Sequence, residues 1–362
     1  MSSEVTPVVS FCIPVYNNAE AAVKIVNSLL SSDDVRFEVV VSDDASTDNA
    51  EELLSAINDE RFRYCRNEKN LGAHKNWEHS LELGKGEWLY LIMGRDMMNG
   101  KNIPALIERL TQAHENNVTF MKDGGHKRGG LSISEGIDAM INFITYNHPT
   151  GCIFRADLFR AIPNRTHYFE IADMYPEVYV IRDLLLKGKG AYIHSGVGLG
   201  GYASDKGKVK STVEHGIDIH KTYFSPDRRT KQFFEQVDMI ESDLHGVFTA
   251  DELDRFFRAK YKFFLENVSY WWRMWCRDPV QMAHYGQPVR YIGVREMTRN
   301  MIQGYRDTKT HLQEKGTYTP ARHRIMLAVT AKTIIHISTK SIIRSIIEPL
   351  GIWKILHFFR NY

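Results

Sequence analysis

The sequence predicts an α/β protein: a mostly parallel sheet flanked by helices, followed by a helical C-terminal region. Short apolar, β-branched runs alternate with amphipathic stretches over the first hundred residues, which is the pattern of a doubly wound sheet. Polar loop residues follow these runs, at the edge of such a sheet where ligands bind. Beyond about His215, long helical segments rich in aromatic side chains replace this alternation.

The expected elements follow one another in a regular order. The first strand, residues 8–15, is an apolar run that ends before the polar pair Asn17-Asn18, and an apolar-periodic helix follows at 21–30. Further strands are expected at 37–41, 61–65 and 87–93, with helices at 50–57 and 77–83. The loops that follow the strands carry Tyr16, Asp43, Asp44 and Asp96, and we expect these side chains to meet at one edge of the sheet.

The chain is long enough for a second structural region. At 362 residues it exceeds what one hydrophobic core usually organises. We expect a catalytic domain over residues 1–214 and a mainly helical region over 215–362. The end of that region combines aromatic side chains with many basic ones, which suits an anionic membrane surface; a buried helix hairpin or a contact between copies of the chain is the alternative. The basic residues are Arg322, Arg324, Lys332, Lys340, Arg344, Lys354 and Arg360.

Composition narrows the classes of function. The net charge is +2, so bulk charge does not indicate a nucleic-acid-binding protein, and we expect no nucleic-acid partner. Four widely spaced cysteines favour reduced thiols in a cytoplasmic protein. The first residues lack the pattern of a signal peptide, and no apolar segment reaches the roughly 18 to 20 residues of a membrane-spanning helix. The expected location is the cytoplasm, with the inner face of the plasma membrane as the place where a basic tail would bind.

Four segments carry a resemblance to a known family. They are VSFCIPVYNN, EVVVSDDASTDNA, RNEKNLGAHKN and GKGEWLYLIMGRD, in that order along the chain. Together they resemble the family 2 glycosyltransferases of the GT-A fold, a Rossmann-like α/β fold, over roughly residues 8–200. The resemblance implies an inverting enzyme that transfers a sugar from a nucleotide-diphosphate sugar to a hydroxyl acceptor. It also implies a setting in bacterial polysaccharide, O-antigen or capsule biosynthesis, with a glycan or lipid-linked acceptor.

The resemblance places the donor near the first three strand ends. It implies that Asp44 accepts the N–H of the donor's base and that Pro14 and Tyr16 line the base pocket. Taken alone, Asp43 and Asp44 could equally serve as a turn or N-cap device for the following helix. Glycine permits close approach to phosphate, and a lysine nearby supplies positive charge. The implied donor-binding residues in these segments are Pro14, Tyr16, Asp43, Asp44, Asn70, Gly72 and Lys75.

The segment after the fourth strand departs from the family pattern. Relatives usually carry a D-x-D motif there, which holds a divalent cation, whereas this chain retains Asp96 and has Arg95 where an acid is usual. We expect Asp96 to hold Mg²⁺ or Mn²⁺ together with the donor phosphates and water. Arg95 could instead neutralise the diphosphate directly, or pair with Asp96.

The resemblance also implies a general base before a later helix. Glu177 stands at that position, with Asp173 as the competitor. The simpler interpretation of either residue is a helix-start carboxylate favoured by the helix dipole.

Two other functions remain open. A catalytically eroded GT-A protein could act as a nucleotide-sugar binding or scaffold subunit, because the metal motif is reduced. A nucleotidyltransferase is disfavoured, because no glycine-rich basic loop follows the first strand.

Overall fold

The structure is a computed structural model of the 362-residue chain. It describes residues 6–94, 96–124, 131–145, 149–171, 175–202, 213–214, 217–218, 225–279, 282 and 288–347. The chain forms two compact units, Met1–Asp205 and Lys206–Tyr362, and each is described by itself. The domain boundary expected at residue 214 lies in a stretch, 203–224, of which only 213–214 and 217–218 are described.

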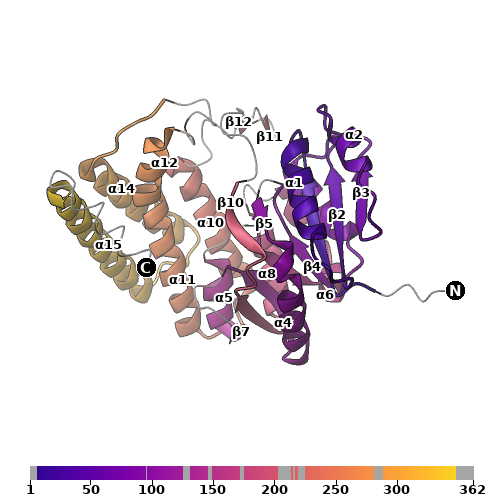
Figure 1. The fold of residues 1–362 in the computed structure, drawn as a ribbon. Coiled ribbons are helices and arrows are strands. Elements are labelled where there is room, and N and C mark those ends of the chain that lie inside the picture. Colours follow the sequence, from indigo (N-terminus) through magenta and orange to yellow (C-terminus); the bar gives the residue numbers. More distant parts are fainter. Residues whose placement is uncertain are drawn as a thin grey trace. The chain divides into compact units, whose positions relative to one another are not determined.

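An eight-stranded sheet organises the first unit (Figure 1). The strand order across the sheet is β3-β2-β1-β4-β8-β6-β9-β7. The strands are β1 (Val9–Val15), β2 (Phe37–Asp43), β3 (Phe62–Arg66), β4 (Trp88–Leu91), β6 (Val118–Asp123), β7 (Leu131–Ser134), β8 (Cys152–Arg155) and β9 (Lys189–Ile193). The expected fold class is confirmed: the sheet is mostly parallel, and helices flank it.

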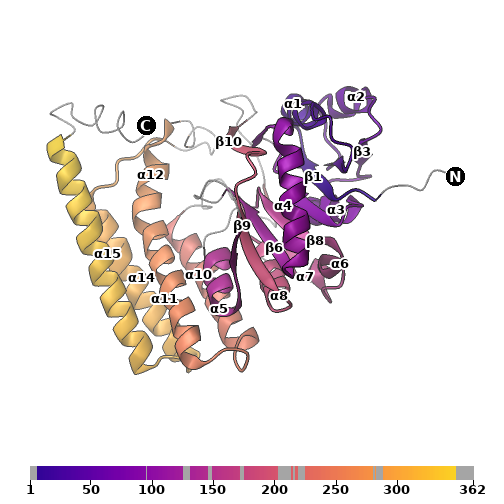
Figure 2. The same cartoon turned by 60° about the horizontal axis from the view of Figure 1, so that its bottom comes forward.

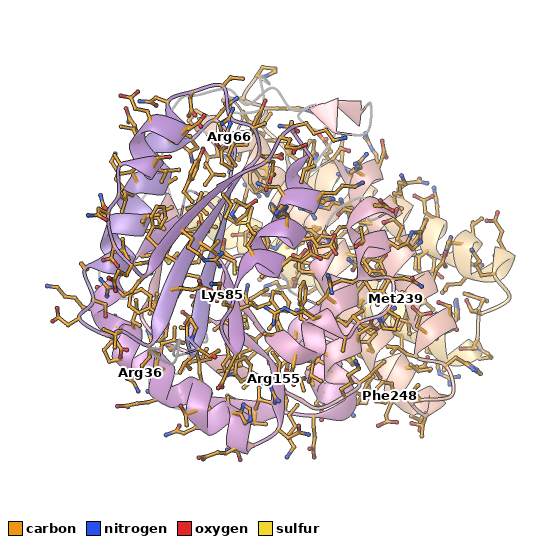
Figure 3. The ribbon with its side chains drawn as sticks, turned by 90° about the vertical axis from the view of Figure 1, so that its right-hand side faces the viewer. Arg36, Arg66, Lys85, Arg155, Met239 and Phe248 are labelled. Carbon is orange, nitrogen blue, oxygen red and sulfur yellow. The ribbon has the colours of Figure 1, made fainter. Side chains whose placement is uncertain are left out.

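The direction of the strands decides which loops meet. Strands β1 to β4 are mutually parallel, β8 is antiparallel to both β4 and β6, and β9 is parallel to β6. The carboxyl ends of β1, β2, β3, β4, β6 and β9 therefore share one edge of the sheet, where β8 begins. Figure 3 labels Arg66, the last residue of β3, at this edge and Arg36, which precedes β2, at the opposite edge.

Helices cover both faces of this sheet. On one face, α1 (Ala19–Leu30), α2 (Ala50–Ser55) and α4 (Ile103–Glu115) share a core with alternate residues of the strands, such as Phe11, Val39 and Tyr90. In Figure 1 the indigo helices α1 and α2 lie beside β2 and β3. Helix α3 (Ala73–Leu83) packs on β1 and β2, and α8 (Glu177–Leu185) on β6 and β9. The smaller helices are η1 (Gly100–Asn102), α5 (Gly136–Ile144), α6 (Ala156–Arg160) and α7 (Arg165–Ile171).

A two-stranded ribbon extends the edge at which the strands end. Strand β5 (Asp96–Met98) pairs antiparallel with β10 (Gly198–Tyr202). The carboxylate of Asp123 fixes the chain before β10, because it accepts the backbone N–H of Ser195 at 3.0 Å and the hydroxyl of Tyr90 at 2.6 Å. The ribbon therefore holds Asp96 next to the ends of β4 and β6.

The second unit is mainly helical, as expected for the C-terminal region. Its helices (Figure 2) are α10 (Pro226–Asp243), α11 (Ala250–Glu266), the π-helical η2 (Asn267–Trp271), α12 (Trp272–Arg277), α14 (Val294–Glu314) and α15 (Pro320–Ile347). Two short strands, β11 (Val213–Glu214) and β12 (Ile217–Asp218), pair with each other. Their shared core includes Phe257, Tyr261, Met301 and Met326. A capping box at Thr249 and Glu252 starts α11.

One basic residue of the expected membrane-binding tail does not face outward. Arg322 is buried and pairs with Glu241 at 2.5 Å and with Asp254 at 3.2 Å. A buried charge needs such partners, because desolvation without them is costly. Arg322 therefore belongs to the internal packing of this unit rather than to an exposed basic surface.

Two further sequence expectations concern the whole chain. Within the described part of the chain, no helix has the length and apolar character to cross a membrane. All four cysteines are free thiols; Cys65 is partly exposed and the other three are buried.

Candidate active site

The residues expected to bind a donor meet at the carboxyl edge of the sheet. Asp43 ends β2 and is fully buried. Its carboxylate accepts the hydroxyl of Tyr64 at 2.6 Å, the guanidinium of Arg66 at 2.8 Å and the backbone N–H of Ser46 at 3.1 Å. With its charge paired and its lone pairs used, Asp43 fixes the turn after β2.

Asp44 organises the next loop of this edge. One carboxylate oxygen accepts the side-chain amide of Asn67 at 3.1 Å and the N–H of Leu71 at 2.7 Å, and the other accepts the N–H of Gly72 at 3.0 Å. A carboxylate offers about four acceptor positions, so one on the second oxygen remains for a ligand. The expected contact with the donor's base stays a prediction, and the structure adds a second role for Asp44, holding the loop 67–72.

Gly72 makes the turn that leads into α3. Its φ is +85°, a conformation that other residues adopt only with strain, and no atom lies within 4 Å of the position of a side-chain Cβ. Open space beside this glycine suits the approach of a ligand. Asn70 supports the turn, because it donates to the backbone oxygen of Asp44 and accepts the N–H of Gly72.

The end of β1 lies beside the end of β4. The side chain of Asn18 donates to the backbone oxygen of Gly94 at 2.7 Å, and the backbone oxygen of Pro14 lies 3.0 Å from the position of a Cβ on Gly94. A side chain at residue 94 would therefore push β1 and β4 apart. Tyr16, which directly follows β1, is 38% exposed, so its ring can contact a ligand.

Asp96 lies on β5 and is largely buried. Its carboxylate accepts a hydrogen bond from the hydroxyl of Thr150. Thr150 in turn lies close to the end of β4, because its hydroxyl oxygen accepts the N–H of Met93 at 3.3 Å. Among the residues that the structure describes, no group of three or more His, Cys, Asp or Glu side chains could hold a metal ion. A cation bound by Asp96 would take its other ligands from the donor and from water.

Glu177 begins α8 at the same edge. The helix runs back across the sheet and leads into β9, so its first residue lies where β6 and β9 end. The residue is 1% exposed, and neither carboxylate oxygen has a hydrogen-bond partner among the described residues. Burial raises the pKa of Glu177 to about 7, against the opposing effects of its own backbone N–H and of the charge of Lys122. A carboxyl group that ionises near neutral pH suits proton transfer.

The backbone before Glu177 is unusual. Tyr175 has a φ of +60°, which is rare for a bulky residue, and the backbone oxygen of Tyr175 accepts the N–H of Val178 at 3.0 Å. Such conformations persist where the surrounding structure holds them and are common at functional sites.

The comparison with known families agrees with this geometry. The family model described as glycosyl transferase family 2 matches residues 10–161, which contain β1 to β8 and every donor-side residue discussed above. This part of the chain therefore resembles glycosyl transferase family 2.

Curated relatives match over shorter stretches of the chain. Abequosyltransferase RfbV of Salmonella typhimurium is 34% identical over 105 residues, which cover 28% of this chain and 31% of that protein. Succinoglycan biosynthesis protein ExoO of Rhizobium meliloti is 31% identical over 107 residues, 30% of this chain and 31% of that protein. The matches span about a third of the length of these relatives.

A solved structure shares the fold over a longer stretch. The crystal structure of TarS from S. aureus superimposes with a TM-score of 0.53 at 15% identity, covering 88% of this chain and 55% of that chain. At this level of identity the likeness shows a shared fold and nothing further.

Three residues assigned to the family 2 site from the sequence need separate mention. Arg95 and Asp173 lie outside the described residues. Lys75 is partly exposed, and its ammonium pairs with Glu170 of α7 at 3.0 Å. A donor phosphate would have to compete with Glu170 for Lys75, and the assigned roles of all these site residues stay predictions.

Sequence reasoning missed the residues that connect the two sides of the site. Lys122 and Asp123 end β6, and Thr150 and Ser195 lie in the loops beside them. The signal was present: charged residues end the apolar run from Val118 to Met121, just as Asp43 and Asp44 end theirs. From the sequence alone, the glycine-rich and basic stretch 121–130 instead predicts a loop that includes Lys122 and Asp123.

Proposed function

We propose that this protein transfers a sugar from a nucleotide-diphosphate sugar to a hydroxyl group by direct displacement, with inversion at the anomeric carbon. The match of residues 10–161 to the family 2 model supports glycosyl transfer. The relatives named for abequose transfer and succinoglycan biosynthesis support a bacterial surface glycan intermediate as the acceptor. The alternative, a scaffold subunit that binds nucleotide sugars without turnover, makes a different prediction for Glu177, the residue that carries the proposal.

The state of Glu177 favours catalysis over scaffolding. A buried carboxylate without hydrogen-bond partners among the described residues costs free energy, and a scaffold has no use for it. A base that ionises near pH 7 can take the proton of an acceptor hydroxyl while that oxygen forms its bond to the anomeric carbon. The bond from the anomeric carbon to the diphosphate breaks at the same time, and its electron pair leaves with the phosphate oxygen.

The donor side of the site supplies binding and orientation. In this proposal the donor's base lies against Pro14 and Tyr16, and its N–H donates to the remaining acceptor position of Asp44. The diphosphate lies near the turn at Gly72, where the backbone leaves open space. Holding the anomeric carbon close to the acceptor oxygen contributes much of the rate, because it removes the entropy cost of their encounter.

A divalent cation fits the donor side. Mg²⁺ or Mn²⁺ would be held by Asp96 and by the diphosphate oxygens of the donor, since these ions are often bound through one or two carboxylates and substrate phosphates. Its chemistry there would be to offset the negative charge that develops on the leaving diphosphate. Thr150 holds the Asp96 carboxylate in place for this contact.

The test compares Glu177→Gln with two other variants. With water as acceptor, we would measure release of nucleoside diphosphate from UDP-, GDP-, CDP- and dTDP-hexoses, and repeat the measurement with glycan acceptors. Glu177→Gln should bind the donor normally and lose turnover by about a hundredfold or more. Asp183→Asn, on the same helix, is the matched control and should retain turnover.

Two outcomes would overturn the proposal. Donor binding without turnover in the wild-type protein, with every donor and acceptor tried, would favour the scaffold. Normal turnover in Glu177→Gln together with loss of turnover in Asp173→Asn would transfer the role of base to Asp173.

A further inference from the structure

Lys122 lies between the donor side and the acceptor side of the site. It is the penultimate residue of β6, at the edge where the strands end. Its ammonium donates to the backbone oxygen of Thr150 at 2.6 Å and lies 3.6 Å from the sulfur of Cys152. The lysine is thus tied to the segment that enters β8.

Thr150 transmits this contact to Asp96. Its hydroxyl donates to the Asp96 carboxylate, while the same oxygen accepts the N–H of Met93. The next residue, Gly151, has a φ of +81° and joins the sheet, because its N–H donates to Leu91 at 3.0 Å. Thr150 therefore has little freedom, and Lys122 holds its carbonyl from the other side.

Lys122 also lies on β6, one of the strands against which the helix of Glu177 packs. Helix α8 packs against α5, α6, α7, β6 and β9. The charged residues described on these elements are Lys122, Asp123, Asp138, Asp157, Arg160, Arg165, Glu170 and Lys189. Of these, Lys122 is the one whose charge acts on the Glu177 carboxyl, and it lowers the pKa of that group. The neighbouring thiol of Cys152 stays neutral, because burial raises its pKa to about 12.

We propose that Lys122 is a positioning residue of this site, which fixes Asp96 through Thr150 and provides the positive charge that faces the buried carboxylate of Glu177. This inference rests on the proposed function. It adds a residue to both halves of the reaction, because one ammonium supports the donor-side acid and the acceptor-side base.

The movement of negative charge during the proposed reaction explains how Lys122 would help. Before the reaction, the negative charge lies on Glu177. When Glu177 takes the acceptor's proton, that carboxyl becomes neutral, and the electron pair of the broken bond leaves on the diphosphate beside Asp96. A fixed cation between these two places interacts favourably with the charge at the start and at the end of its movement, without reorganising.

A pH profile separates this role from a structural one. We would measure kcat/KM for donor hydrolysis from pH 5 to 9.5 in the wild-type protein, Lys122→Met and Lys122→Arg. Loss of the positive charge should move the acid limb of the profile upward by about one pH unit or more, because an opposite charge nearby favours the ionised carboxylate. Lys122→Arg should leave the limb in place, and so should Lys189→Met, a control at the other end of the neighbouring strand β9.

A second variant tests the contact with Asp96. Thr150→Val removes the hydroxyl but keeps the shape, and it should weaken donor binding roughly three- to tenfold while the acid limb stays where it is. If Lys122→Met does not fold, Lys122→Gln offers the same comparison, because it removes the charge and retains a donor for the Thr150 carbonyl.

The possible failures are distinguishable. A wild-type protein that binds donors without turnover contradicts the proposed function. Two results would overturn the role of Lys122 and leave the proposed function intact, provided that the wild-type protein turns over. One is an acid limb at the same pH in Lys122→Met and the wild type. The other is an unchanged donor affinity in Thr150→Val.

Discussion

Burial of Glu177 should make the stability of this protein depend on pH in a direction that can be measured without any substrate. The pKa of this carboxyl is about 7, compared with an ordinary value of 4.5. Each pKa unit is worth about 1.4 kcal/mol, so the folded state loses on the order of 3 kcal/mol when Glu177 ionises. Glu177→Gln removes that cost and keeps the size of the side chain.

The direction of the pH dependence follows from the number of protons bound in the folded and unfolded states. Between pH 4.5 and 7 the folded protein holds a proton on Glu177 that the unfolded chain has released. Stability contributed by this group therefore falls as the pH rises through this window and levels off above pH 7. Glu177→Gln should match the wild type near pH 4.5 and exceed its stability by about 3 kcal/mol at pH 8.

Urea denaturation at pH 5 and pH 8 measures the difference. The transition of the first unit can be followed through the fluorescence of Trp88, a buried residue of β4. Asp183→Asn is the control, because it removes a carboxylate paired with Arg182 from the same helix and should gain no stability as the pH rises. If the free energy of unfolding changes equally between pH 5 and pH 8 in the wild type and in Glu177→Gln, the reasoning is refuted.

Three further predictions concern the donor and the tail. Asp44→Ala should weaken binding of nucleoside diphosphates by about tenfold or more in calorimetry, because a hydrogen bond to a charged acceptor is worth roughly 1.5 to 3 kcal/mol. The control Asp48→Ala, which removes a cap from α1, should leave this affinity unchanged. Equal affinities of the two variants would contradict the assignment of Asp44. Chelation should suppress turnover, Mn²⁺ or Mg²⁺ should restore it, and Asp96→Ala should lose the restoration; full activity in chelator would exclude the metal. The full chain should bind anionic vesicles in a salt-sensitive way, because each basic residue near the membrane surface adds about 1 kcal/mol to binding. A chain that ends at Ile347 should bind these vesicles less. Equal binding to neutral vesicles would contradict a membrane role.

The end point of that truncation comes from the structure. A chain that ends before Arg322 would lose α15, which contributes Met326 and Val329 to the core of the helical unit, and with it two buried ion pairs. Loss of vesicle binding in such a variant would report unfolding. Ending the chain at Ile347 keeps these contacts.

The periodicity of apolar residues was enough to predict β1 to β4 and the edge at which these strands end. Strands such as 37–41 are buried on both faces and rich in β-branched residues, so their positions were clear from the sequence. The limits of the elements were less accurate. Helix α3 begins at Ala73 rather than Trp77, because the left-handed turn at Gly72 lets it start directly after the loop.

Contacts between distant segments could not be predicted. The bonds from Lys122 to Thr150 and from Thr150 to Asp96 join residues that are 28 and 54 positions apart. Arg322 was counted as a surface charge, because its partner Asp254 precedes it by 68 residues. The apolar pattern says which elements pack, but polar partners depend on the register of that packing.

The hydrogen bonds within the donor loops distinguish residues that the fold needs from residues that only the proposed activity needs. Asp43 and Asp44 each satisfy three or more polar groups of the protein itself, so a descendant of this fold that had lost its chemistry would still need them to fold. Finding this pair in a sequence therefore identifies lineage. The Glu177 carboxylate has no hydrogen-bond partner among the described residues, and its burial disfavours the ionised form at neutral pH, so an inactive descendant would gain by replacing it. If Glu177 acts as we propose, the acid at the start of α8 is the more informative residue in a search of genomes for active proteins of this fold.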